Sequence, residues 1–324
     1  MKYRTIPTVY GDLEVSSIVM GSAMSMSHLP KDVYYSIYDT YFEAGGNIVD
    51  TARSYGTGGR LEKQVGDYLK ETGRTDQIII STKGCHPDRG GPSRLSFEDM
   101  QKDVDESLEA LYRDHIDLWW IHKDDESVPV EGIVDGYNRL IKEGKVFAVG
   151  CSNWSVDRIR AAQAYAEATN QHGFVASQIN WALAYSLQGF SPDPANKTMD
   201  DYSYDWYYNQ NMPVFSFSSQ AQGFFPRVDA NGIKSLPDEL QKMYASPENM
   251  RRLKFAKEFA EEHHCSLSAV ALAYLLNNKL TCFPIIGAES VDMLKLSLEA
   301  ADVEMTEEES DRLYHAASKR QTAF

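Results

Sequence analysis

Four ionisable residues of different types lie at or near the ends of apolar stretches of strand length. Taken singly each has an ordinary explanation, because a strand-terminal Asp often caps a helix, a Lys is usually solvated and a lone His is more often structural than catalytic. Together they provide a proton donor, a cation, a carboxylate and an imidazole, which suits acid–base chemistry at a carbonyl oxygen. These candidates are Asp50, Tyr55, Lys83 and His122.

The chemistry of the four side chains is complementary. Reduction of a carbonyl places negative charge on its oxygen, so a proton donor must stand within hydrogen-bond reach of that oxygen, and Tyr55 can be that donor. An unperturbed tyrosine has a pKa of about 10, and a neighbouring ammonium such as that of Lys83 favours its phenolate form. Asp50 can pair with this ammonium and hold it in place. His122 can orient the carbonyl or assist proton transfer.

These residues can meet only if the stretches that carry them are neighbouring parallel strands. Eight apolar stretches alternate with helical patterns, which is typical of a (β/α)8 TIM barrel, and an open doubly wound sheet is the alternative. In such a barrel the carboxyl ends of the strands share the mouth where active sites lie. We expect strands at 17–21, 46–50, 77–83, 116–122, 146–152, 174–180, 212–218 and 281–287, and helices at 31–44, 60–71, 96–112, 129–142, 155–169, 199–210, 250–276 and 291–301.

Additional elements are expected before, within and after the repeat. A hairpin at 3–16 should precede the barrel. The segment 222–247 is rich in Pro, Gly, Asp and Asn and is expected to form a long loop over the mouth. A C-terminal helix at 306–317 should begin with a capping box of Thr306 and Glu309 and pack outside the barrel. No linker is apparent, so residues 1–324 are predicted to form one domain.

The composition disfavours several classes of function. With 43% hydrophobic and 24% charged residues, the 324-residue chain has the composition of a globular protein. The net charge of -15 and the absence of a dense basic stripe disfavour nucleic acid as a partner. No apolar stretch approaches the roughly 18 residues needed to span a bilayer, and no secretory signal is apparent. We therefore expect a cytoplasmic monomer or homo-oligomer without membrane insertion.

The cysteines and histidines do not suggest a metal site. Cys85, Cys151, Cys265 and Cys282 are widely spaced, so buried free thiols are expected rather than a disulfide framework or zinc ligands. The adjacent pair His263 and His264 would diverge on a helix. A metal-dependent hydrolase or an aldolase is disfavoured accordingly.

Four segments resemble the signature segments of the aldo-keto reductase family, in the order in which that family has them. They are 47–56, 81–84, 117–122 and 149–154, and the match extends over essentially the whole chain. The resemblance implies a β/α barrel, NAD(P)H-dependent reduction of an aldehyde or ketone or the reverse oxidation, and a catalytic tetrad of Asp50, Tyr55, Lys83 and His122. The family binds its cofactor without a Gly-rich phosphate loop, and the glycines at 56–59 do not complete one.

The same resemblance implies a cofactor site for NADP(H) or NAD(H). Ser152, Asn153 and Gln178 would hold the nicotinamide carboxamide, Phe217 would stack under its ring, and Ser218 and Gln220 would contact the pyrophosphate. Phe217 could also be an ordinary core residue, since its strand is apolar. The full set of cofactor-binding candidates is Gly21, Ser22, Asp50, Ser152, Asn153, Gln178, Phe217, Ser218, Gln220, Gly287, Ala288, Glu289, Met293 and Ser297.

The adenosine end departs from the family pattern. Glu289 and Met293 stand where NADP-preferring members usually carry Lys or Arg, and Ser297 stands at the usual asparagine position. An acidic side chain favours a ribose hydroxyl over a ribose phosphate, by analogy with the dinucleotide rule of another fold. A preference for NAD is therefore a hypothesis, and the choice between NAD and NADP stays open.

The substrate side is less constrained. Met24, Lys123 and Trp154 are expected to line it together with Tyr55 and His122. Lys123 would suit a polar or anionic substrate such as a sugar-derived carbonyl, or it points to solvent. An aromatic stretch suits either carbohydrate stacking or a subunit interface; it comprises Tyr202, Tyr204, Trp206, Tyr207 and Tyr208.

A non-enzymatic function remains as an alternative at this stage. Some barrels that resemble aldo-keto reductases serve as cofactor-sensing subunits of membrane complexes, because a fold does not by itself fix a function. An intact tetrad is compatible with such a cofactor-binding regulatory subunit with little turnover.

Overall fold

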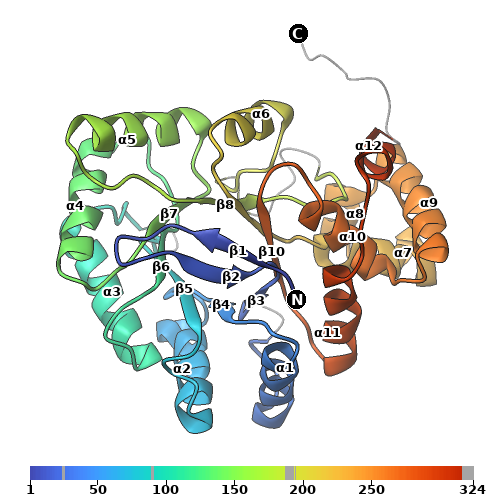
Figure 1. The fold of residues 1–324 in the computed structure, drawn as a ribbon, viewed down its shortest axis with the longest axis horizontal. Helices are drawn as coiled ribbons and strands as arrows, with labels where there is room; N and C mark the ends of the chain where they lie inside the picture. Colours follow the sequence, from blue (N-terminus) through green and yellow to red (C-terminus); the bar gives the residue numbers. More distant parts are fainter. Residues whose placement is uncertain (24–25, 89–90, 187–192, 194, 316–324) are drawn as a thin grey trace.

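Eight short strands pair in parallel and close into a barrel, preceded by an antiparallel hairpin (Figure 1). The computed structural model describes residues 1–23, 26–88, 91–186, 193 and 195–315. Each barrel strand pairs with the next along the chain, and the last closes on the first. The expected (β/α)8 barrel with an N-terminal hairpin is thereby confirmed. The hairpin strands are β1 (Tyr3–Ile6) and β2 (Leu13–Ser16), and the barrel strands are β3 (Val19–Gly21), β4 (Ile48–Asp50), β5 (Ile79–Gly84), β6 (Leu118–Ile121), β7 (Val149–Ser152), β8 (Ser177–Asn180), β9 (Val214–Phe217) and β10 (Cys282–Ile286).

Helices surround the barrel (Figure 1). Several begin at a serine whose side chain accepts a hydrogen bond from the backbone N–H three residues later, which satisfies one of the free donors of a helix start. The helices are α1 (Lys31–Glu43), α2 (Arg60–Thr72), α3 (Phe97–Leu111), α4 (Val130–Lys142), α5 (Val156–Ala168), α6 (Asp201–Asn209), α7 (Phe224–Asn231), α8 (Asp238–Tyr244), α9 (Pro247–Glu262), α10 (Leu267–Leu276), α11 (Val291–Leu298) and α12 (Glu307–His315), with short 3-10 turns η1 (Thr57–Gly59), η2 (Ala221–Gly223), η3 (Ile233–Ser235) and η4 (Glu299–Ala301).

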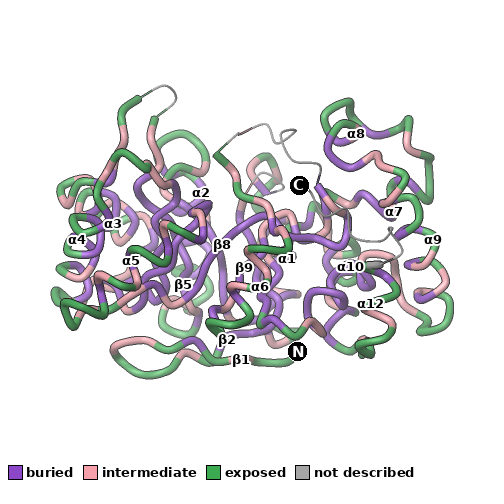
Figure 2. Tube along the Cα trace, turned by 90° about the horizontal axis from the view of Figure 1, so that it is seen from above, coloured by how far each residue is buried: buried purple, intermediate pink, exposed green. Residues whose placement is uncertain are grey.

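Aromatic side chains of β6, β9 and β10 pack together in the barrel interior. The ring of Phe215 lies 4.5 Å from that of Phe283 and 5.0 Å from that of Trp120, measured between ring centroids. The same cluster includes Ile6 and Val15 of the hairpin. Contacts from the hairpin to residues that precede β4 and β7 place it at the amino ends of the strands, and Figure 2 shows it on the side of the molecule opposite α8. The interior is a packed core rather than a channel, so ligands must bind at the mouth.

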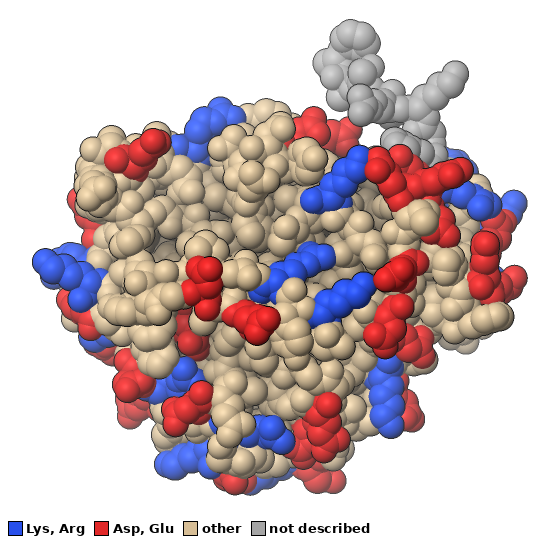
Figure 3. Space-filling model, viewed as in Figure 1, with Lys and Arg blue, Asp and Glu red and all other residues tan. Residues whose placement is uncertain are grey.

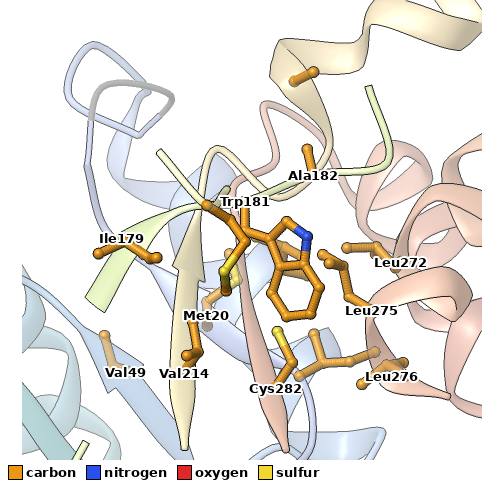
Figure 4. Packing of buried hydrophobic residues seen from close by; sticks show 14 of the residues in the cluster. Met20, Val49, Ile179, Trp181, Ala182, Val214, Leu272, Leu275, Leu276 and Cys282 are labelled. Carbon is orange, nitrogen blue, oxygen red and sulfur yellow. The ribbon is translucent and has the colours of Figure 1, made fainter. Parts of the chain in front are cut away.

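A second apolar cluster lies between the barrel and its helices. Figure 4 shows the indole of Trp181 beside Leu272 and Leu275 of α10. Trp181 also contacts Tyr204 and Tyr274 edge to face, with ring centroids 5.9 and 6.3 Å apart. This packing fixes α6 and α10 against the strands whose ends carry the site.

Two expectations about the helices were wrong. The pattern at 250–276 is not one helix, because the chain breaks at His264, whose φ is 53°, and α10 starts afresh after the cap Ser266. The segment 222–247 is not a long loop, because Phe224 and Leu240 bury apolar side chains that order α7 and α8. Apolar periodicity alone does not separate consecutive helices or reveal short ones.

The C-terminal helix is confirmed as far as the structure describes it. In the capping box of α12, the Thr306 backbone N–H donates to Glu309 Oε2 at 2.7 Å, and the Glu309 N–H donates to Thr306 Oγ1. Residues 316 and 317 of the expected helix lie outside the described residues.

Charges of both signs are interspersed over the face shown in Figure 3. Within the described residues no helix is long and apolar enough to cross a membrane. All four cysteines are free; three are buried and Cys265 is partly exposed. The cytoplasmic location, the oligomeric state, the lack of affinity for nucleic acid and the single domain over 1–324 stay predictions.

The packing inside the barrel predicts a strong asymmetry between two glycine substitutions. A Cβ at Gly150 of β7 would lie 2.3 Å from the Trp120 ring and 2.9 Å from the Ala176 carbonyl oxygen. Gly150→Ala should therefore lower the free energy of unfolding by about 1–3 kcal/mol, measured by urea denaturation. Gly132→Ala, at an exposed position of α4 where a Cβ meets nothing within 4 Å, is the control and should be neutral or stabilising. Equal effects at both positions would contradict this account of the core.

Candidate active site

The carboxyl ends of the strands open into a cavity of about 2090 Å³. Asp50 is the last residue of β4, Lys83 lies near the end of β5 and His122 directly follows β6. Asp50, Tyr55 and His122 line the cavity, while the fully buried Lys83 lies beneath its surface. The structure thus brings together the four residues that the sequence singled out.

A buried ion pair forms the base of the site. Lys83 Nζ lies 2.5 Å from Asp50 Oδ2 and donates a further hydrogen bond of 2.7 Å to the backbone oxygen of Thr51. Both side chains of the pair are almost completely shielded from solvent. A buried charge is tolerated when its partner and remaining hydrogen bonds are in place, and removing one partner is strongly destabilising.

The second carboxylate oxygen of Asp50 ties this pair to the barrel core. It accepts hydrogen bonds from Ser81 Oγ at 2.7 Å and from Gln178 Nε2 at 3.1 Å. Ser81 Oγ in turn accepts a bond of 2.8 Å from Trp120 Nε1. Ser81 was missed in the sequence, although it lies two residues before Lys83 in the same strand and hence on the same face.

The phenol of Tyr55 lies between the ammonium and the imidazole. Its ring centroid is 4.8 Å from Lys83 Nζ and 5.7 Å from the centroid of the His122 ring. Burial raises the pKa of Tyr55, and this outweighs the opposite effect of the Lys83 charge. At neutral pH Tyr55 is therefore a phenol with a proton to donate, and the nearby ammonium is placed to stabilise the phenolate that donation leaves.

The pKa values of the two basic side chains beside Tyr55 are shifted in opposite directions. Burial disfavours the charge of Lys83, but the attraction of Asp50 and then Tyr55 outweighs it, so the pKa of Lys83 is raised. The pKa of His122 lies well below the usual histidine value, chiefly because of burial and then because of electrostatic repulsion of the imidazolium form by Lys83, His86 and Lys123. The imidazole of His122 is therefore neutral at pH 7.

A second imidazole and a hydroxyl border His122. The ring centroid of His86 lies 4.8 Å from that of His122, and Ser54 Oγ lies 3.3 Å from His122 Nδ1. Both residues line the cavity. The sequence reasoning missed them because a lone His or Ser in a loop carries no spacing signal, although His86 follows Lys83 by only three residues.

The cavity extends from the tetrad along the ends of β7, β8 and β9 to α11, and most of the expected cofactor contacts line it. Gln220 Nε2 donates to Ser297 Oγ at 3.0 Å and so links the end of β9 to α11. Ser22 and Ala288 are buried and are not part of the described lining. The expected residues in the lining are Gly21, Asp50, Ser152, Asn153, Gln178, Phe217, Ser218, Gln220, Gly287, Glu289, Met293 and Ser297.

The residues present fit a dinucleotide. Phe217 offers an aromatic face, and amide and hydroxyl groups follow it along the groove. Asn153 and Ser218 adopt left-handed backbone conformations, with φ of 62° and 51°. Such conformations in residues other than glycine are uncommon and cluster at ligand sites. Arg227 of α7 also lines the cavity and was missed, because its segment was expected to be a loop.

The substrate side differs from the expectation in several respects. Trp154 does not line the cavity: it is buried and packs edge to face on Phe174. Met24 lies outside the described residues. Lys123 does line the cavity and does not point to solvent, because it is buried and paired with Asp193. The described cavity lining includes none of the aromatic residues of 202–208. The expectation that a carbohydrate stacks on them at this site is therefore wrong.

Comparison with known proteins agrees with this geometry. Residues 17–317 match the model of the Aldo/keto reductase family. The chain belongs to this family. It is therefore an NAD(P)-dependent oxidoreductase with the barrel fold of an aldo/keto reductase.

The curated relatives are distant but extend over most of the chain. An aryl-alcohol dehydrogenase of Pestalotiopsis microspora is 25% identical over 315 residues, covering 94% of this chain and 77% of the relative. A norsolorinic acid reductase of Emericella nidulans is 25% identical over 327 residues, covering 95% and 79%. An NADP(+) aryl-alcohol dehydrogenase of Phanerodontia chrysosporium is 26% identical over 333 residues, covering 92% and 81%.

The neutral state of His122 predicts a specific pH dependence of stability. Its folded-state pKa lies below the unfolded value of about 6.5, so the unfolded state binds the proton first as the pH falls. The stabilising contribution is complete above about pH 6.5 and is lost as the pH falls toward the folded-state pKa. Both proteins should lose free energy of unfolding as the pH is lowered from about 7.5 to about 5.5, and His122→Asn should lose less than the wild type. The difference between the two losses should be up to about 1.4 kcal/mol per pH unit.

Urea denaturation at the two pH values measures this difference. The control is His172→Asn at an exposed position, which should retain the pH dependence of the wild type. An unchanged pH dependence in His122→Asn would show that His122 is not held neutral by folding.

Proposed function

We propose that this aldo/keto reductase reduces the carbonyl group of an aldehyde or ketone to an alcohol, or catalyses the reverse oxidation, with Tyr55 as the proton donor. The observation that carries the proposal is the buried Asp50–Lys83 pair, whose ammonium lies 4.8 Å from the Tyr55 ring. The bound reduced nicotinamide would supply the hydride to the carbonyl carbon.

Each member of the tetrad then has a distinct role. Tyr55 donates its phenolic proton to the carbonyl oxygen as negative charge develops there. Lys83 stabilises the resulting phenolate, and Asp50 fixes Lys83 through a bond of 2.5 Å. The neutral imidazole of His122 hydrogen-bonds the carbonyl oxygen and orients it toward Tyr55.

The cofactor would be held by groups at the ends of β7, β8 and β9. Gln178 Nε2 already donates to Asp50, which leaves Gln178 Oε1 to accept from the carboxamide NH₂ group. Ser152 and Asn153 would supply the remaining carboxamide contacts, and Phe217 would stack on the ring. Ser218, Gln220 and Arg227 would contact the pyrophosphate, with Arg227 supplying the positive charge.

Substitution of Tyr55 tests the proposed function. Tyr55→Phe keeps the ring but removes the proton, so kcat for reduction of an aldehyde should fall by at least about 10²-fold. Absorbance of the reduced nicotinamide measures turnover, and quenching of tryptophan fluorescence measures cofactor binding, which should change little. Unchanged turnover would contradict the donor role of Tyr55. Negligible turnover by the wild type across an aldehyde and ketone panel, with intact cofactor binding, would favour a regulatory cofactor-binding subunit instead.

We further propose that the enzyme prefers NAD(H) to NADP(H). Glu289 is exposed, lines the adenosine end of the cavity and precedes α11 by two residues. A carboxylate there repels the ribose phosphate of NADP and can accept a bond from the ribose hydroxyl of NAD. The name of the Phanerodontia chrysosporium relative specifies NADP(+), so on this proposal the present chain differs from it.

A charge reversal tests the cofactor preference. Glu289→Arg should tighten NADPH relative to NADH by at least about tenfold, which corresponds to about 1.4 kcal/mol, as measured by fluorescence titration of both cofactors. Glu304→Arg, remote from the cavity, is the charge-matched control and should leave the ratio unchanged. A wild-type protein that binds NADPH much more tightly than NADH would overturn this proposal.

A further inference from the structure

We propose that Lys123 and Asp193 together bind a hydroxyl group of the substrate, so that the enzyme acts on neutral carbonyl compounds that carry hydroxyl groups close to the carbonyl. This inference rests on the proposed reductase function.

The position of Lys123 places it beside the reacting group. It follows His122 directly, and both residues line the cavity together with His86 and Asp193. The Lys123 side chain is only 9% exposed, whereas that of Asp193 is 42% exposed. An ammonium this well shielded has lost most of its water, so it must obtain its hydrogen bonds from the protein or from a bound ligand.

The hydrogen bonds of the pair leave both a donor and an acceptor for a ligand. Lys123 Nζ donates to Asp193 Oδ2 at 2.5 Å and to Asn196 Oδ1 at 3.0 Å. These bonds use two of the three ammonium protons, and the third has no partner among the residues that the structure describes. Asp193 Oδ1 accepts one bond of 2.9 Å from the Ala195 N–H and can accept another.

A hydroxyl group complements this arrangement. It accepts a hydrogen bond from the third ammonium proton and donates its own proton to the carboxylate, so both partners are satisfied at once. An aldehyde without the hydroxyl would leave the third ammonium proton of Lys123 without this partner, and a buried unpaired donor carries a free-energy penalty.

The charge balance of the pair disfavours an anionic ligand. Asp193 neutralises Lys123, and the carboxylate of Asp88 also lines the cavity. A substrate carboxylate or phosphate bound at this pair would therefore meet the negative charge of Asp193 while the charge of Lys123 is already neutralised. The earlier alternative of an anionic substrate is disfavoured, whereas a neutral polyol chain meets no such repulsion.

The surroundings of the pair are polar as well. His86 Nδ1 lies 2.7 Å from the Pro87 carbonyl oxygen, so Nδ1 donates its proton there and Nε2 is left for a ligand. Trp154, the residue expected to give this side an apolar aromatic surface, is buried in the core instead. A second substrate hydroxyl, which can donate or accept, thus finds a hydrogen-bond partner in His86 Nε2.

Anchoring of the chain is not a sufficient explanation for the pairing of the buried Lys123 with the partly exposed Asp193. The segment that carries Asp193 is also fixed at Lys197, whose N–H donates to Asn153 Oδ1 and whose carbonyl accepts from the Asn180 N–H. Buried ion pairs contribute little net stability compared with apolar packing. Two backbone anchors without charged groups already hold this segment at the ends of β7 and β8.

A matched pair of aldehydes tests the inference through kcat/KM. Glyceraldehyde carries two hydroxyl groups and propanal carries none, while both have three carbons. Lys123→Met should lower kcat/KM for glyceraldehyde by about 10- to 100-fold and leave that for propanal within about threefold. The control is Lys145→Met, which removes a lysine paired with Asp105 outside the cavity lining, and it should leave both values unchanged.

The possible outcomes separate the alternatives. An equal loss of kcat/KM for both aldehydes in Lys123→Met would mean that the pair only positions the chain. A wild-type preference for glyceraldehyde 3-phosphate would mean that the substrate is anionic. Either result overturns the inference. Asp193→Asn, which keeps the shape of the side chain, must also lower the ratio of the two kcat/KM values, and an unchanged ratio in a folded Asp193→Asn protein would likewise overturn it.

A binding measurement covers the case in which the proposed function itself fails. If the wild type turns over neither aldehyde, the reductase proposal is wrong. Saturation-transfer NMR then decides the inference: binding of glycerol but not of propan-1-ol, lost in Lys123→Met, would support hydroxyl recognition. Equal signals for the two alcohols, or no binding of glycerol, would overturn it.

Discussion

The buried ion pair between Asp50 and Lys83 is the interaction on which the rest of the site depends. It lies where β4 and β5 end. The carboxylate oxygen of Asp50 that does not face Lys83 accepts hydrogen bonds from Ser81 and Gln178. Through Ser81 the pair is bonded to Trp120 in the centre of the barrel. The core that stabilises the fold and the charge that the chemistry needs are therefore one connected network, in which a missing member would leave a buried charge without its partner.

The pair and the burial around it together influence the protonation states of its neighbours. Burial, and to a lesser extent the nearby ammonium of Lys83, holds the pKa of His122 low, whereas burial raises the pKa of Tyr55 against the opposite effect of Lys83. A donor that is protonated and a neighbour that is not can both act at the same pH. The second cation at the mouth, Lys123, contributes to the same field but is neutralised by Asp193. The mouth thus has one side, around Lys83, that suits proton transfer and another, around Lys123 and Asp193, that suits binding of polar groups.

The chain itself carried more information about the fold than about the ligand surfaces. Alternating apolar and helical patterns gave all eight barrel strands, because strands buried on both sides must be continuously apolar. They gave the wrong account of 222–247 and of 250–276, where short helices and a break at His264 depend on packing partners distant in the sequence. Ser81 could have been found from its spacing to Lys83. Arg227 and Asp193 could not, since nothing near them in the chain indicates that they line the cavity.

By itself, the sequence determined the family, the barrel and the convergence of Asp50, Tyr55, Lys83 and His122, because polar residues at the ends of apolar strands must converge once those strands close. Only the tertiary structure decided which neighbours each of them has. Trp154 faces the core rather than the cavity, and Lys123 pairs with Asp193 seventy residues further along the chain. The physical reason is that strand direction is a local property, whereas burial and ion pairing depend on which loops fold over the mouth.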